Sequence, residues 1–82
     1  MASARVNIPE DLSGLLNSEW EHIIREAGYS KTDAEIARRY IVGKTPQIDV
    51  ADALFMERST LSRRLPEIYT KARKTASKLH MM

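Results

Sequence analysis

The stretch from Gln47 to Leu65 constrains the fold most, because two short apolar sets at helical spacing occur there with a break between them. The first set is Val50, Ala51 and Leu54, and the second is Leu61 and Leu65. Residues three and four apart share one face of a helix, so each set predicts an amphipathic helix. Met56 lies between the sets, and a break over residues 55–57 has the length of a tight interhelical turn. The pattern predicts a helix-turn-helix over residues 46–65.

The second helix of this pair has a polar outer face. Arg58, Ser59, Ser62 and Arg63 occupy positions i, i+1, i+4 and i+5, which form one exposed stripe. Arginine binds guanine bidentately, and serine donates to or accepts from several bases, so the stripe predicts contacts with DNA base edges. The alternative is an ordinary solvated face, because most charged runs on helices are exposed to water alone.

The predicted turn has unusual chemistry. Phe55 stands where such turns commonly have glycine, since the chain there adopts a left-handed conformation. A bulky residue adopts positive φ only at a cost in free energy. We therefore expect a looser turn than usual.

Size and composition narrow the class of protein. The chain has 82 residues, which make one small domain with a modest core that dimerisation would help to stabilise. It has no cysteine, so disulfide scaffolds and thiolate metal sites are excluded. No apolar run has the length of a signal peptide core or a membrane span. We expect a cytoplasmic protein without cofactor, metal or membrane contact.

The net charge of +2 hides a strong asymmetry. Residues 1–57 contain six Lys/Arg against ten Asp/Glu, a balance of −4, whereas residues 58–82 contain seven against one, a balance of +6. A basic half that begins at the second helix of the motif is the distribution expected of a surface that faces phosphates.

Further helices are predicted upstream of the motif. We expect a flexible tail over residues 1–8 and a short helix from Pro9 to Leu16, because proline is favoured in a first turn. Ser18 with Glu21 forms a capping box that predicts a helix through Trp20 to a stop at Gly28. Trp20 is expected to anchor the core.

The next helix is predicted from about Asp33 to Val42, with Gly43 as its stop. Capping signals at Ser30 and Thr32 precede it. Thr45 and Pro46 then predict the cap and first residue of the motif's first helix. Helix N-termini bind anions, so Thr45 and Gln47 are candidate phosphate ligands, together with Arg64 and Lys71.

Pro66 predicts the end of the base-reading helix, since proline cannot continue the hydrogen-bond ladder but can begin a new helix. A last helix is predicted over residues 66–79. Its apolar face could pack on the domain or pair with a second copy of the chain. The candidate dimerisation residues on that face are Ile68, Tyr69, Ala72, Ala76 and Leu79.

The run EIARRYIVGKTPQIDVADALFMERSTLSRRL resembles the helix-turn-helix region of plasmid TrfB/KorA-type repressors, which have a similar Glu-Ile-Ala-Arg helix and a Gly-Lys-Pro-Gln-like link. A weaker likeness, in the Tyr-(Ile/Leu)-Val-Gly step, exists to PapB-type fimbrial regulators. The first resemblance implies a homodimeric repressor at palindromic operators of plasmid or mobile-element promoters, with the base-reading helix at Arg58 to Arg64. Phe55 and Arg64 depart from that pattern, because the family usually has glycine and an apolar residue there.

Together these features predict an all-α domain over residues 9–82 with four to five helices and a helix-turn-helix. We expect a bacterial, nucleoid- or plasmid-associated homodimer that represses transcription by occupying the major groove of a palindrome, with a second regulatory protein as a possible partner. The alternative is an adaptor or inhibitor that uses the same scaffold to hold another protein. An enzyme is not expected, because only His22 and His80 could act as bases near neutral pH, and His80 lies in a C-terminal tail with no evident nucleophile beside it.

Overall fold

The computed structural model describes residues 8–81, and all of their regular structure is helical. The elements are α1 (Glu10–Ser13), α2 (Asn17–Glu26), α3 (Lys31–Ile36), η1 (Ala37–Val42), α4 (Gln47–Ala53) and α5 (Arg58–Lys78). Because η1 is a π-helical continuation of α3, this part of the chain has five helices and no strand. The predicted all-α class is confirmed. Within residues 8–81, no helix combines the length and apolar character that crossing a bilayer requires.

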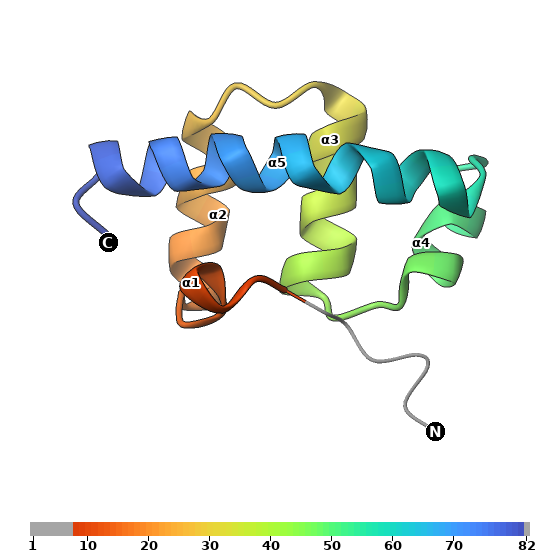
Figure 1. Ribbon diagram of the computed structural model, residues 1–82, viewed down its shortest axis with the longest axis horizontal. Helices are drawn as coiled ribbons and strands as arrows, with labels where there is room; N and C mark the ends of the chain where they lie inside the picture. Colours follow the sequence, from red (N-terminus) through yellow and green to blue (C-terminus); the bar gives the residue numbers. More distant parts are fainter. Residues whose placement is uncertain (1–7, 82) are drawn as a thin grey trace.

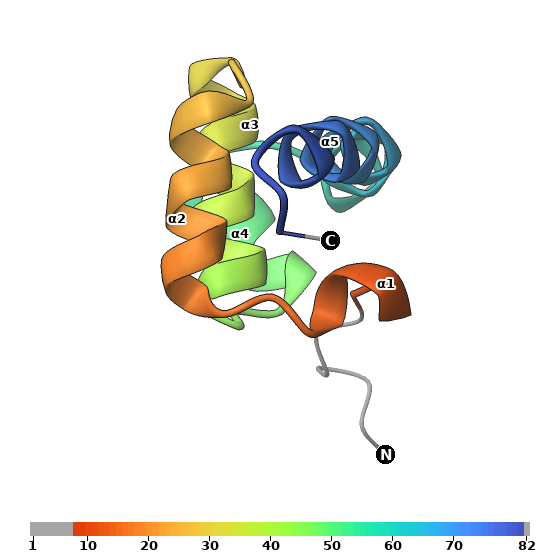
Figure 2. The same ribbon diagram turned by 90° about the vertical axis from the view of Figure 1, so that its left-hand side faces the viewer.

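Helix α5 organises the molecule. It has 21 residues, about 30 Å at 1.5 Å per residue, against a longest molecular dimension of 34 Å. Figure 1 shows α5 lying across α2 and α3, with α4 near its N-terminal end. In Figure 2 the same helix is seen end-on beside the layer formed by α2, α3 and α4. Helices α2, α3 and α4 all contact α5, so the core lies between this long helix and the others.

The core is one cluster of buried apolar side chains to which every helix contributes. Trp20 is 2% exposed and is among its largest members, so the prediction of a tryptophan anchor is confirmed. Val50 and Ala51 of α4 pack with Leu61 and Leu65 of α5 in this cluster, as the apolar spacing predicts. His22 of α2 is exposed.

The ends of α2 and α3 show which local signals the chain uses. Gly28 has φ +71, so the predicted glycine stop after α2 is confirmed. The predicted capping box at Ser18 is wrong, because α2 begins at Asn17 and Glu19 accepts a hydrogen bond from the Leu16 amide at 2.8 Å. Before α3, the Ser30 hydroxyl accepts from the Asp33 amide at 3.1 Å and caps the helix.

The predicted first helix is shorter than expected. It spans Glu10–Ser13 rather than Pro9 to Leu16, and Leu16 is 65% exposed in the link to α2. Leu12 alone on α1 is fully buried, which is what a single turn can contribute to the core. Residues 1–7 of the predicted tail lie outside the described residues, and Ile8 is half-buried against the core.

The predicted helix break at Pro66 is wrong. Helix α5 runs from Arg58 to Lys78 with Pro66 inside it, so residues 58–65 and 66–78 form one helix. Proline removes one backbone donor and crowds the carbonyl four residues before it. Leu65 and Ile68, on either side of Pro66, are both buried, and this burial offsets part of the cost.

Candidate nucleic-acid interface

Helix α4, a connection over residues 54–57 and the first turns of α5 form a compact helix pair. The Met56 amide donates to the Ala51 carbonyl at 3.0 Å, and the Phe55 amide donates to Asp52 at 3.2 Å, which closes the turn. Phe55 has φ 56, so the turn keeps its left-handed residue and is not looser, contrary to our expectation. Ala51 is 3% exposed, consistent with a close approach of the two helices.

The four residues predicted to read bases share one exposed region at the N-terminal end of α5. Arg58, Ser59, Ser62 and Arg63 are all exposed. None of the four side chains has a hydrogen bond or ion pair with any residue in 8–81. The predicted exposure of the stripe is therefore confirmed. Two guanidinium groups and two hydroxyls are left available for a ligand outside this part of the chain.

The start of α4 differs from the prediction. The helix begins at Gln47 and Pro46 occupies the cap position, so Thr45 does not cap it, and Pro46 is not its first residue. The Gln47 side chain donates to the Tyr40 hydroxyl at 3.3 Å and is half-buried. Phosphate contacts by Thr45 and Gln47 receive no support from this geometry. Helix α4 has only seven residues, and the side-chain amide nitrogen of Gln47 already binds the Tyr40 hydroxyl.

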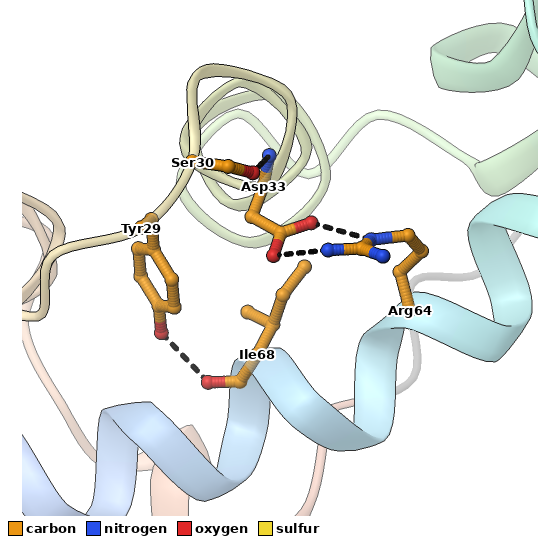
Figure 3. Close-up of polar contacts among 5 residues, drawn as sticks. All are labelled: Tyr29, Ser30, Asp33, Arg64 and Ile68. Atoms are coloured by element: carbon orange, nitrogen blue, oxygen red, sulfur yellow. Dashed lines mark hydrogen bonds and ion pairs between the residues drawn. The ribbon is translucent and has the colours of Figure 1, made fainter.

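Arg64, a predicted phosphate ligand, has a partner within the protein (Figure 3). Its Nε and Nη2 atoms donate to Oδ1 and Oδ2 of Asp33, each at 2.7 Å. Asp33 is 3% exposed, and a buried carboxylate requires such a partner. This hydrogen bond raises the pKa of Arg64 above its ordinary value. Arg64 thus neutralises a buried acid within the protein.

The remaining cations of α5 divide into one paired and five free groups. Arg73 donates to Asp11 of α1 at 2.6 and 3.2 Å, and this hydrogen bond holds the pKa of Asp11 below its ordinary value. The free cations are exposed and have no ion pair with the described residues. They are Arg58, Arg63, Lys71, Lys74 and Lys78.

The free cations extend the candidate interface along α5. Lys71 was predicted as a phosphate ligand and is exposed, as that role requires. Lys74 also belongs to this surface, although it was not among the predicted phosphate ligands, and its spacing from Arg63 indicates this. It lies eleven residues after Arg63, which is three helical turns, so the two side chains project from nearly the same line along the helix.

Four of the five predicted dimerisation residues belong to the core of a single chain. Ile68, Ala72 and Ala76 are fully buried, and Tyr69 is 9% exposed. Leu79 is half-buried. Of the alternatives left open for this helix face, packing on its own domain is the one observed.

The surface of α4 and the turn has a different character. Ile48 is 60% exposed and Phe55 is 95% exposed, and these are two of the three large apolar side chains most open to solvent in residues 8–81. Asp49, Asp52 and Glu57, which are close to them in the sequence, are exposed as well. No Lys or Arg occurs between Lys44 and Arg58, so this surface is acidic where the face of α5 is basic.

No protein-family model, no curated protein and no solved structure matches the chain. The resemblance to TrfB/KorA-type repressors stays a prediction. Among residues 8–81, no three His, Cys, Asp or Glu side chains are grouped as they would be around a metal ion.

Proposed function

We propose that the protein binds double-stranded DNA in a sequence-specific manner through the N-terminal half of α5. The observation that carries the proposal is the exposed, unpaired stripe of Arg58, Ser59, Ser62 and Arg63 on a helix anchored in the core. A B-DNA major groove is about 12 Å wide and admits one α-helix. The guanidinium and hydroxyl groups of the stripe can donate hydrogen bonds to the acceptor atoms that guanine and other bases present in this groove.

The free cations farther along α5 would contact the phosphate backbone. Lys71 and Lys74 carry strongly hydrated point charges, which suit phosphates better than base edges. Neither side chain would have to break an ion pair with residues 8–81 to reach DNA. Arg64 is left out of the proposed interface, because releasing it would leave Asp33 buried without a cation.

The proposed regulator acts as a homodimeric repressor. Two copies on a palindrome would place their base-reading helices about 34 Å apart, in successive major grooves. Polymerase would be excluded by occupancy of the promoter. The dimer contact would use surface outside the buried face of α5, since Ile68, Ala72 and Ala76 are already covered within one chain.

Selection of duplexes from a randomised library, followed by sequencing, tests this proposal. A salt concentration of about 0.15 M suppresses most nonspecific charge attraction. We expect an enriched palindrome with half-sites about one helical turn apart, and a complex that contains two protein chains. If the protein retains all duplexes weakly and without regard to sequence, the proposal is contradicted.

A second candidate function is supported by the surface of α4 and the turn. Exposed Ile48 and Phe55 amid three carboxylates would suit a partner protein with an apolar, positively charged surface. This adaptor function predicts no enriched duplex. It also predicts a stoichiometric protein complex that is lost in the double variant Ile48→Ser/Phe55→Ser and retained in Arg63→Ala.

A further inference from the structure

Helix α5 has a weak point at Pro66, between the base-reading stripe and the basic C-terminal half. Pro66 has no amide hydrogen, so the Ser62 carbonyl lacks the donor that the helix would otherwise supply. The Thr70 hydroxyl donates back to the Pro66 carbonyl at 2.9 Å, an arrangement that favours bending. Prolines are the commonest sites of sharp helix kinks. The helix nevertheless continues through this point.

Two polar ties hold α5 on either side of Pro66 (Figure 3). Before the proline, Arg64 makes its bidentate contact with Asp33. After the proline, the Ile68 carbonyl accepts a 2.7 Å hydrogen bond from the Tyr29 hydroxyl. The two contact points on α5 are four residues apart, about one helical turn, with Pro66 midway between them.

Both ties come from one short segment at the start of α3. Tyr29 and Asp33 flank Ser30, whose hydroxyl caps α3 through the Asp33 amide. Asp33 is buried, and Tyr29 is half-buried. The segment is thus fixed to the body of the protein and can act as a rigid support for α5.

We propose that Tyr29 and Asp33 are positioning residues for DNA reading, which brace α5 at Pro66 and fix the direction in which residues 58–65 project. This inference rests on the proposed function. Arg58 lies eight residues before Pro66, a lever of about 12 Å, so a kink of about 20° would move it by roughly 4 Å. That displacement exceeds the tolerance of about 0.5 Å within which binding side chains have to be held for productive contacts.

The test is a rescue experiment with the duplex selected by the wild-type protein. Tyr29→Phe removes only the hydroxyl that binds Ile68, and Asp33→Asn removes the charge that binds Arg64. Pro66→Ala restores the missing backbone donor and stiffens α5 without the brace. We expect each brace variant to bind about fivefold more weakly, as loss of one hydrogen bond allows, and Pro66→Ala to restore affinity to within about twofold.

Asp11→Asn is the matched control, because it removes the carboxylate that binds Arg73 on α5, about two helical turns beyond Pro66. Any change of affinity caused by Asp11→Asn should persist when Pro66→Ala is added. If Pro66→Ala fails to rescue the brace variants, or reverses the effect of Asp11→Asn equally, the positioning role is overturned.

Amide hydrogen exchange of the DNA-free protein tests the brace independently of DNA binding. We expect Tyr29→Phe to speed exchange of the α5 amides within one turn of Pro66, and Pro66→Ala to reverse this. Unchanged exchange would overturn the brace even if DNA binding is established. If the wild-type protein selects no duplex, the proposed function fails, and the positioning role fails with it. The exchange result would then report on the brace alone.

Discussion

Arg64 and Asp33 join α5 to the first turn of α3 through two hydrogen bonds of 2.7 Å, one to each carboxylate oxygen. Asp33 is buried, whereas the Arg64 side chain is 38% exposed, so the cost of separation falls mainly on the carboxylate. Arg64 therefore stabilises the fold mainly by neutralising the buried carboxylate of Asp33.

Replacement of Arg64 alone should be worse than replacement of both partners. Arg64→Met leaves the Asp33 carboxylate buried without a cation, and we expect the melting temperature to fall by about 5 °C or more in a domain of this size. Asp33→Asn/Arg64→Met removes both charges and should recover part of the loss. Arg63→Met is the control and should melt like the wild type, because Arg63 is exposed and has no ion pair with the described part of the chain. A double variant less stable than Arg64→Met would contradict this account.

Phe55→Gly should stabilise the protein. Phe55 has φ 56 and is 95% exposed, so its ring contributes almost no packing while its backbone conformation is strained. Glycine relieves a cost of roughly 1–2 kcal/mol and adds unfolded-state entropy, for a net gain of about 0.5–1 kcal/mol. The urea midpoint measures this gain. Gly28→Ala, at φ +71, should change stability in the opposite direction. A loss of stability in Phe55→Gly would show that the ring packs against the protein.

Alkaline pH should destabilise the fold through two tyrosines. Burial raises the pKa of Tyr69 to about 12, and burial also raises the pKa of Tyr29 above its ordinary value. Both groups bind their proton more tightly in the folded state, so their contribution is complete below the ordinary pKa of 10.0 and is lost as the pH rises through the folded values.

Urea unfolding at a series of pH values between about 9 and 12 checks this direction. Tyr29→Phe should cost about 1 kcal/mol at neutral pH, the usual net value of one hydrogen bond. The same variant should lose less stability than the wild type between neutral and alkaline pH. Equal losses in the two proteins would contradict the role given to Tyr29.

Lys71→Ala should weaken binding to selected and random duplexes about equally. Lys71 is exposed and has no ion pair within residues 8–81, so its proposed contact is with phosphate alone. Loss of one phosphate contact lowers the slope of log K against log salt by about 1. Arg25→Ala, an equal charge change at an exposed position on α2, should leave the slope unchanged. A selective loss on the chosen duplex would instead assign Lys71 to base recognition.

Local patterns in the sequence were sufficient for much of the fold. The spacing of Val50, Ala51, Leu61 and Leu65 identified a helix pair that shares a core, and Gly28 marked a helix end. Both signals act within a few residues, where backbone geometry decides the outcome. The exposure of Arg58 and Arg63 followed from the same periodicity.

Features that depend on contacts distant in sequence were not predictable from these patterns. Pro66 is a local signal for a helix end, yet the helix is continuous. Residues on both sides of Pro66 are buried, and α5 is bound there by Tyr29 and Asp33, which are distant in sequence. Arg64 looks like a phosphate ligand until its partner 31 residues away is known. For the same reason, the apolar face of residues 68–76 could not be assigned to the core rather than to a second chain.

The most direct measurement is a repeat of the duplex selection with Arg63→Ala beside the wild-type protein. Because Arg63 is proposed to contact one base pair, the account predicts that preference is lost at one position in each half-site while the flanking preferences remain, with a cost of about 1–3 kcal/mol on the original duplex. Enrichment of an identical motif by both proteins would contradict the claim that this face of α5 reads DNA sequence.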